Sequence, residues 1–138
     1  MMDYQSKIQN SIDYIENNLS EELKLNDIAK QSYFSGFYFH KLFRKFTGTS
    51  VMEYVRNRRL AEAASDLVKT GEKITDIAFK YQFSSEESFS RAFKRIYGMS
   101  PRKYRTINSI VSYNENERKL YKFQKRYSSN GTTLSMAA

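Results

Sequence analysis

The sequence contains the same motif twice, with one copy in residues 25–54 and the other in residues 74–104. Each copy has, in the same order, an Asp-Ile-Ala triplet, a Phe-Ser pair, two Phe residues four positions apart, and then a Gly, a Ser and a Tyr. The offset between the copies is 49 up to the Phe-Ser pair and 50 after it, so the second copy has one extra residue there. An internal repeat of this kind predicts that the fold contains one supersecondary unit twice.

The spacing of apolar residues predicts that the whole chain is helical. Apolar side chains recur three and four positions apart, as on one face of an α-helix. Serines are placed to cap helix starts at Ser35, Ser50, Ser84 and Ser100. The predicted helices span residues 6–19, 26–32, 36–47, 51–69 and 75–80, followed by one that ends at residue 97 and one that begins at residue 101. We therefore predict an all-α fold of about seven helices.

One face of each predicted helix is expected to be buried. The predicted core consists of Phe39, Phe43, Phe46, Phe89, Phe93, Ile28 and Ile77. The inward-facing positions are expected to include Leu25, Val68 and Ile96 as well. A helical stripe of aromatic residues is more often a core than a cofactor site, so we predict no cofactor.

The repeat also predicts the domain organisation. Residues 1–50 are expected to form one subdomain, residues 51–70 a long linker helix, and residues 71–107 a second subdomain. Residues 108–138 form a basic C-terminal tail, which is either a further helix or a mobile segment.

The composition excludes several classes of function. The chain has no Cys, which rules out disulfides, thiol catalysis and thiolate zinc sites. It has a single histidine, His40, so neither a metal site nor a catalytic triad is expected. No paired carboxylates or Gly-rich phosphate loop occur, and no stretch approaches the ~18 apolar residues of a spanning helix. We predict a soluble, cytoplasmic protein that is not an enzyme and does not bind membranes.

The charge is divided unevenly along the chain. The net charge is +8, but residues 1–34 carry three Lys and six acids (−3), whereas residues 35–138 carry twenty basic and nine acidic residues (+11). This division predicts a basic face for a polyanion. Charge alone fits DNA, RNA or an anionic membrane about equally.

A short helix, a tight turn and a longer helix make a helix-turn-helix, whose second helix enters the DNA major groove. The second copy ends in the motif Ser-Pro-x-x-Tyr-Arg at residues 100–105. Taken together, the two copies, and above all the second, make the chain resemble the AraC/XylS family of bacterial transcription regulators. The resemblance covers residues 6–107, and the length resembles the stand-alone, MarA/SoxS/Rob-like members. It implies two helix-turn-helix subdomains joined by a long helix, in a monomer that binds bent double-stranded DNA and activates transcription with RNA polymerase.

The resemblance also implies which residues contact DNA. The base-reading residues would be Phe37, His40 and Lys41 in the first copy, and Glu86, Glu87, Ser90 and Arg91 in the second. The residues near phosphates would be Ser35, Arg44, Lys45, Ser84, Lys94 and Arg95. The alternative for the charged residues among them is that they are solvent-exposed surface charges without a role in binding. Because Glu86 and Glu87 suit the first turn of a helix and repel phosphate, we expect the second copy to add less affinity than the first.

Two positions depart from the family pattern. Many members have Gly before the Phe-Ser pair, where this chain has Tyr33 and Gln82. If these residues adopt a left-handed conformation, the cost is on the order of 1 kcal/mol each. Two other functions stay open: a low-specificity architectural nucleic-acid-binding protein, and a DNA-binding output fragment of a larger ligand-sensing regulator.

Overall fold

The computed structural model describes residues 3–109, and every regular element among them is a helix. The helices are α1 (Tyr4–Asn17), α2 (Leu25–Lys30), α3 (Gly36–Thr47), α4 (Val51–Lys69), α5 (Ile74–Lys80) and α6 (Glu86–Tyr97), followed by a helical segment over residues 101–109. This confirms the predicted all-α fold of about seven helices. The predicted bounds of α3 and α4 are correct, and those of α1, α2 and α5 differ by one or two residues. The predicted tail lies almost entirely outside the described residues.

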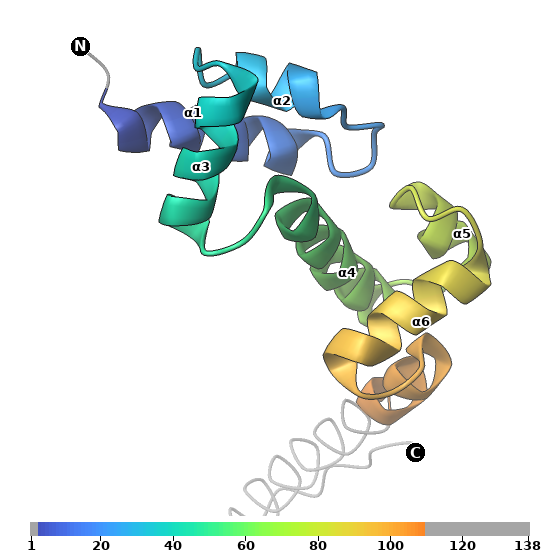
Figure 1. Ribbon diagram of the computed structural model, residues 1–138. Coiled ribbons are helices and arrows are strands. Elements are labelled where there is room, and N and C mark those ends of the chain that lie inside the picture. Colours follow the sequence, from blue (N-terminus) through green and yellow to red (C-terminus); the bar gives the residue numbers. More distant parts are fainter. Residues whose placement is uncertain (1–2, 110–138) are drawn as a thin grey trace, which may run out of the picture.

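The chain forms two helical groups at opposite ends of α4. Figure 1 shows α1, α2 and α3 at one end of this helix, and α5, α6 and the segment 101–109 at the other. The family fold of two helix-turn-helix subdomains joined by a long helix is therefore present. Helix α4 has 19 residues, which makes it roughly 28 Å long at the helical rise per residue.

Helix α4 takes part in two separate hydrophobic cores. Its first half contributes Val51 and Val55 to the core of the first subdomain, where they pack with α1, α2 and α3. Its second half contributes Leu60 and Leu67 to the core of the second subdomain. Because both halves are buried on packed cores, each subdomain is fixed to α4 by apolar packing rather than by a loose linker.

The two cores repeat the same aromatic arrangement. In the first, Phe43 lies edge-on to Tyr54, with ring centroids 5.5 Å apart. In the second, Phe93 lies edge-on to Tyr104, with centroids 5.3 Å apart. Edge-to-face packing at this distance is favourable beyond the area it buries. The repeated Phe and Tyr residues thus make equivalent contacts in the two cores, which explains why they recur in both copies.

Most of the predicted core is buried, but four predicted positions are wrong. Phe46 is 43% exposed and Ile96 is 55% exposed. They occupy equivalent places in the last turns of α3 and α6, one turn beyond Phe43 and Phe93, where neither is part of the core. The periodicity puts them on the correct face, but the core ends one turn earlier. Leu25 and Val68, at the ends of α2 and α4, are exposed for the same reason.

The extra residue of the second copy lies at the start of α6. The sequence predicted Ser84 as the N-cap, but the cap is Ser85, whose hydroxyl oxygen accepts a 3.0 Å hydrogen bond from the backbone N–H of Ser88. In the first copy, Ser35 is the cap, and its hydroxyl accepts from the N–H of Tyr38 at 3.4 Å. The inserted residue therefore lengthens the turn and leaves Ser84 exposed before the helix.

Both turns contain a non-glycine residue in the left-handed conformation. Tyr33 has φ 62° and Gln82 has φ 69°. The steric cost that the sequence analysis expected for this conformation, on the order of 1 kcal/mol, therefore applies to each of the two residues.

Within residues 3–109, none of the helices has both the length and the apolar character that a membrane span requires.

The corrected cap can be tested by comparing two adjacent serines. Ser85→Ala removes the acceptor for the Ser88 N–H, and we expect it to lower the free energy of unfolding by about 1 kcal/mol. Ser84→Ala removes an exposed hydroxyl and should change it by less than about 0.5 kcal/mol. Urea unfolding followed by circular dichroism measures both. A larger loss for Ser84→Ala would contradict the assignment of the cap.

Candidate nucleic-acid interface

The predicted site residues of the first copy lie on one exposed face of α3. On the opposite face, Phe39 and Phe43 are completely buried, which fixes the rotation of the helix about its axis. The predicted residues of this helix are all exposed: Phe37, His40, Lys41, Arg44 and Lys45, preceded by the N-cap Ser35. The packing thus brings the predicted first-copy residues together on one surface.

This surface combines an apolar ring with positive charge. Phe37 is 79% exposed, and the Lys41 ammonium lies 5.9 Å from the centroid of its ring. The His40 ring lies 5.6 Å from that of Phe39, which supports it from the core side. In a major groove, such a face has an apolar group for thymine methyls and cations for guanine or phosphate.

On α6 the predicted residues divide into an exposed and a half-buried set. Glu87, Arg91, Lys94 and Arg95 are exposed, and Glu86 and Ser90 are half-buried. The Glu86 carboxylate accepts a 2.8 Å hydrogen bond from the Thr75 hydroxyl. This bond joins the starts of α5 and α6, so Glu86 has a partner within the protein.

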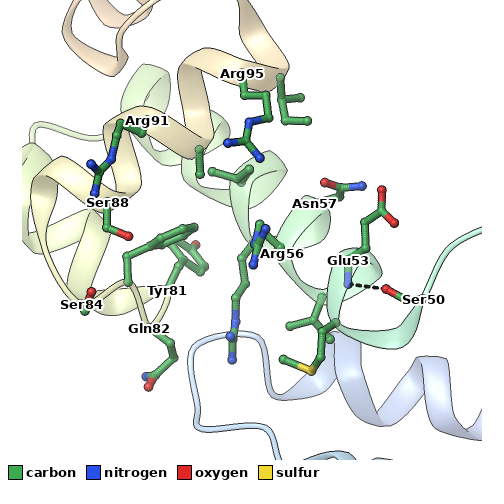
Figure 2. A pocket seen from close by; sticks show the side chains of 17 residues that line it. Ser50, Glu53, Arg56, Asn57, Tyr81, Gln82, Ser84, Ser88, Arg91 and Arg95 are labelled. Carbon is green, nitrogen blue, oxygen red and sulfur yellow. Dashed lines mark hydrogen bonds between the residues drawn. The ribbon is translucent and has the colours of Figure 1, made fainter.

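A cleft of about 770 Å³ lies between the first half of α4 and the second helix-turn-helix. Figure 2 shows Arg56, Arg91 and Arg95 among the side chains that line it, together with Ser84 and Ser88. The cleft is therefore bordered by two arginines of α6, Arg91 and Arg95, and by two of the linker helix, Arg56 and Arg59. Arg56 and Ser88 were not among the predicted site residues.

The three arginines of α4 have different surroundings. Arg58 donates to Glu16 at 2.7 Å and to Glu62 at 3.0 Å, and the hydrogen bond to Glu16 raises its pKa. Arg59 donates to backbone carbonyls of the loop between α1 and α2, and burial lowers its pKa. Arg56 is exposed. The signal for Arg56 was present in the sequence, because the buried positions Val51, Val55 and Leu60 leave residue 56 on the outer face.

Among residues 3–109, no group of three or more His, Cys, Asp or Glu side chains is placed to hold a metal ion. The surface presents the exposed cations of α3 and α6, the exposed ring of Phe37 and the exposed carboxylate of Glu87, and the excess of cations suits binding to a polyanion.

Comparisons with known proteins agree with this geometry. A family model described as a helix-turn-helix domain matches residues 28–107. The HTH-type transcriptional regulator YbfP of Bacillus subtilis is 41% identical over 95% of this chain, but the chain spans only 44% of that protein. The HTH-type transcriptional activator AarP of Providencia stuartii is 43% identical over 74% of each chain. The crystal structure of a regulator from Chromobacterium violaceum, described as having an AraC-type DNA-binding domain, has a TM-score of 0.72 at 29% identity. The structural match covers 75% of this chain and 93% of the Chromobacterium violaceum chain.

The chain therefore belongs to the AraC/XylS family of helix-turn-helix transcription regulators. It carries the DNA-binding domain of that family, and the prediction that it is not an enzyme is confirmed by these relatives.

Proposed function

We propose that the protein is a sequence-specific transcription activator that inserts α3 and α6 into successive major grooves of a bipartite site. The observation that supports this most directly is that two basic helices flank one continuous helix, α4, which is packed into both cores. The length of α4, roughly 28 Å, is close to the ~34 Å of one duplex turn. Bending of the DNA would accommodate the difference.

Under this proposal the residues divide by role. Base edges would be read by Phe37, His40, Lys41, Glu87, Ser90 and Arg91, with Glu86 a base reader only when released from Thr75. Phosphates would be bound by Ser35, Arg44, Lys45, Ser84, Lys94 and Arg95. Arg91 is the strongest candidate for guanine, because a guanidinium donates to O6 and N7 together.

The cleft extends the proposed interface from α6 to the first half of α4. A duplex that places its grooves on α3 and α6 must pass the outer face of α4 with the backbone of the intervening base pairs. Arg56 is exposed on this part of α4 and lines the cleft with Arg95. We assign Arg56 a phosphate contact, which gives affinity but no sequence information.

The proposal includes the remaining implications of the resemblance. The chain would act in the cytoplasm as a monomer on DNA and would contact RNA polymerase. Activation is favoured by the relative AarP, which is named a transcriptional activator. The alternative of an output domain cut from a larger ligand-sensing regulator is favoured by YbfP, of which the chain spans 44%.

The first test is an in vitro selection from duplexes with a randomised region of about 25–30 bp near physiological salt. We expect enrichment of a bipartite motif with half-sites about 10 bp apart, because the proposal puts the two helices in successive grooves. Enrichment of one half-site would mean that a single copy supplies the specificity. Binding without enrichment would contradict the proposal and favour an architectural protein.

The two copies can be compared by removing their cations separately on the selected site. Neutralising Lys41, Arg44 and Lys45 to Gln should weaken binding more than neutralising Arg91, Lys94 and Arg95, because the Glu pair of α6 already opposes phosphate. Each set should also reduce the dependence of affinity on salt, by up to about three units of the logarithmic slope. A larger loss for the α6 set, measured by fluorescence anisotropy, would show the ranking to be wrong.

Arg56 is expected to act through phosphate alone. Arg56→Gln should weaken binding to specific and random duplexes by a similar factor and lower the salt slope by about one unit. Arg102→Gln removes another exposed arginine, one that does not line the cleft, and serves as the matched control. A loss confined to the specific site would argue for base reading by Arg56 instead.

A further inference from the structure

The loop between α1 and α2 accepts hydrogen bonds from side chains that lie outside helices α1, α2 and α3. Arg59 of α4 donates through Nε to the Leu19 carbonyl at 2.9 Å and through Nη2 to the Glu21 carbonyl at 2.7 Å. Between them, the Ser20 carbonyl accepts a 2.9 Å hydrogen bond from Nε2 of Gln82. Three successive carbonyls of one loop are thus bound by two side chains.

The bond from Gln82 differs from the bonds of Arg59 in the parts of the chain that it joins. Arg59 lies on α4, which belongs to both cores, whereas Gln82 lies in the turn between α5 and α6, 62 residues away from Ser20 in sequence. It therefore joins the second helix-turn-helix directly to the first subdomain. Figure 2 shows Gln82 at the border of the cleft, beside Tyr81 and below Ser84.

Gln82 holds this bond from an unfavourable backbone conformation. Its φ of 69° is left-handed, a region in which glycine has no steric penalty. Tyr33 occupies the equivalent position of the first copy with φ 62°, and its side chain is 78% exposed. Glycine at position 82 would remove the strain but also the amide that reaches Ser20. The left-handed conformation and the donor that reaches the other subdomain thus occur at the same residue.

We propose that Gln82 is a positioning residue that acts together with the packing on α4 to fix the relative orientation of the two helix-turn-helix units, and with it the spacing of the half-sites that the protein accepts. This inference rests on the proposed bipartite reading. One inserted base pair moves a half-site by about 3.4 Å and rotates it by about 34°. Discrimination against such an insertion requires that the two units cannot follow the displaced half-site, and the Gln82–Ser20 bond opposes that motion because it joins the two subdomains directly.

The first measurement uses bipartite duplexes of the selected sequence with zero or one inserted base pair between the half-sites. The ratio of the two affinities is the spacing discrimination. A net hydrogen bond corresponds to about a two- to tenfold change in an equilibrium, so we expect Gln82→Gly to reduce the discrimination by that factor. Gln82→Asn, which tolerates the left-handed conformation but is one methylene too short to reach, should behave in the same way.

Tyr33→Gly is the matched control. It relieves the same backbone strain in the first copy without removing a contact between the subdomains, and the spacing discrimination should stay unchanged. Urea unfolding of both glycine variants shows whether each is fully folded under the binding conditions, so a loss of discrimination in a folded Gln82→Gly variant cannot be ascribed to unfolding.

The second measurement reports on the subdomains without DNA. Because the chain has no Cys, Lys24→Cys and Lys73→Cys provide two unique sites for nitroxide labels, at equivalent exposed caps of α2 and α5 that make no side-chain cap bond. The distribution of distances between the labels should broaden in Gln82→Gly and not in Tyr33→Gly.

The outcomes separate the two proposals. An unchanged distribution in Gln82→Gly overturns the role of Gln82, whatever the DNA specificity. A broadened distribution with unchanged spacing discrimination overturns its role in half-site spacing. A wild type that binds both duplexes equally overturns the bipartite function and the spacing role together, while the distances still report whether Gln82 joins the subdomains.

Discussion

The structure depends on the burial of one helix in two cores. Val51 and Val55 are enclosed by the first subdomain, and the second half of α4, from Leu60 to Leu67, is enclosed by the second. A helix with a buried stripe at each end cannot rotate relative to either subdomain without opening close-packed contacts. The directions of α3 and α6 are therefore set by the same rod. This constraint allows two small helix-turn-helix units, each too small for a large core of its own, to act as one reading surface.

Duplication has conserved the inside of the unit and changed its outside. The Phe-Phe-Tyr packing is the same in both cores, with similar ring separations. The outer faces differ: α3 presents an exposed ring with cations, and α6 presents acids at its start and cations along its length. Packing restricts the core to residues that fit, whereas the solvent face is free to change. Two recognition helices of one shape can therefore have different base preferences, and those of one copy cannot be inferred from the other.

The sequence predicted what depends on local periodicity and little of what depends on distant packing. The helix bounds of α3 and α4 and most of the buried Phe residues follow from spacing, capping serines and the repeat. The errors occur where a helix passes the edge of its neighbours, as at Phe46 and Ile96, or where an inserted residue moves a cap, as at Ser85. The bonds of Arg59 and Gln82 to the loop at residues 19–21 join segments some 40 and 60 residues apart. No local pattern predicts them, because they exist only once both subdomains are packed on α4.

The arginines show why net charge alone is a poor measure of a DNA footprint. Within four residues of α4, Arg58 is held in ion pairs, Arg59 is bound to carbonyls, and Arg56 is exposed. The same side chain thus serves as a structural donor or as a surface cation, according to which element packs beside it. An arginine whose guanidinium donates to loop carbonyls cannot use the same donors for a phosphate without giving up those bonds. The cations available to a polyanion are therefore those that the fold leaves unpaired, and the exposed cations of α3, of α6 and Arg56 on α4 are among them.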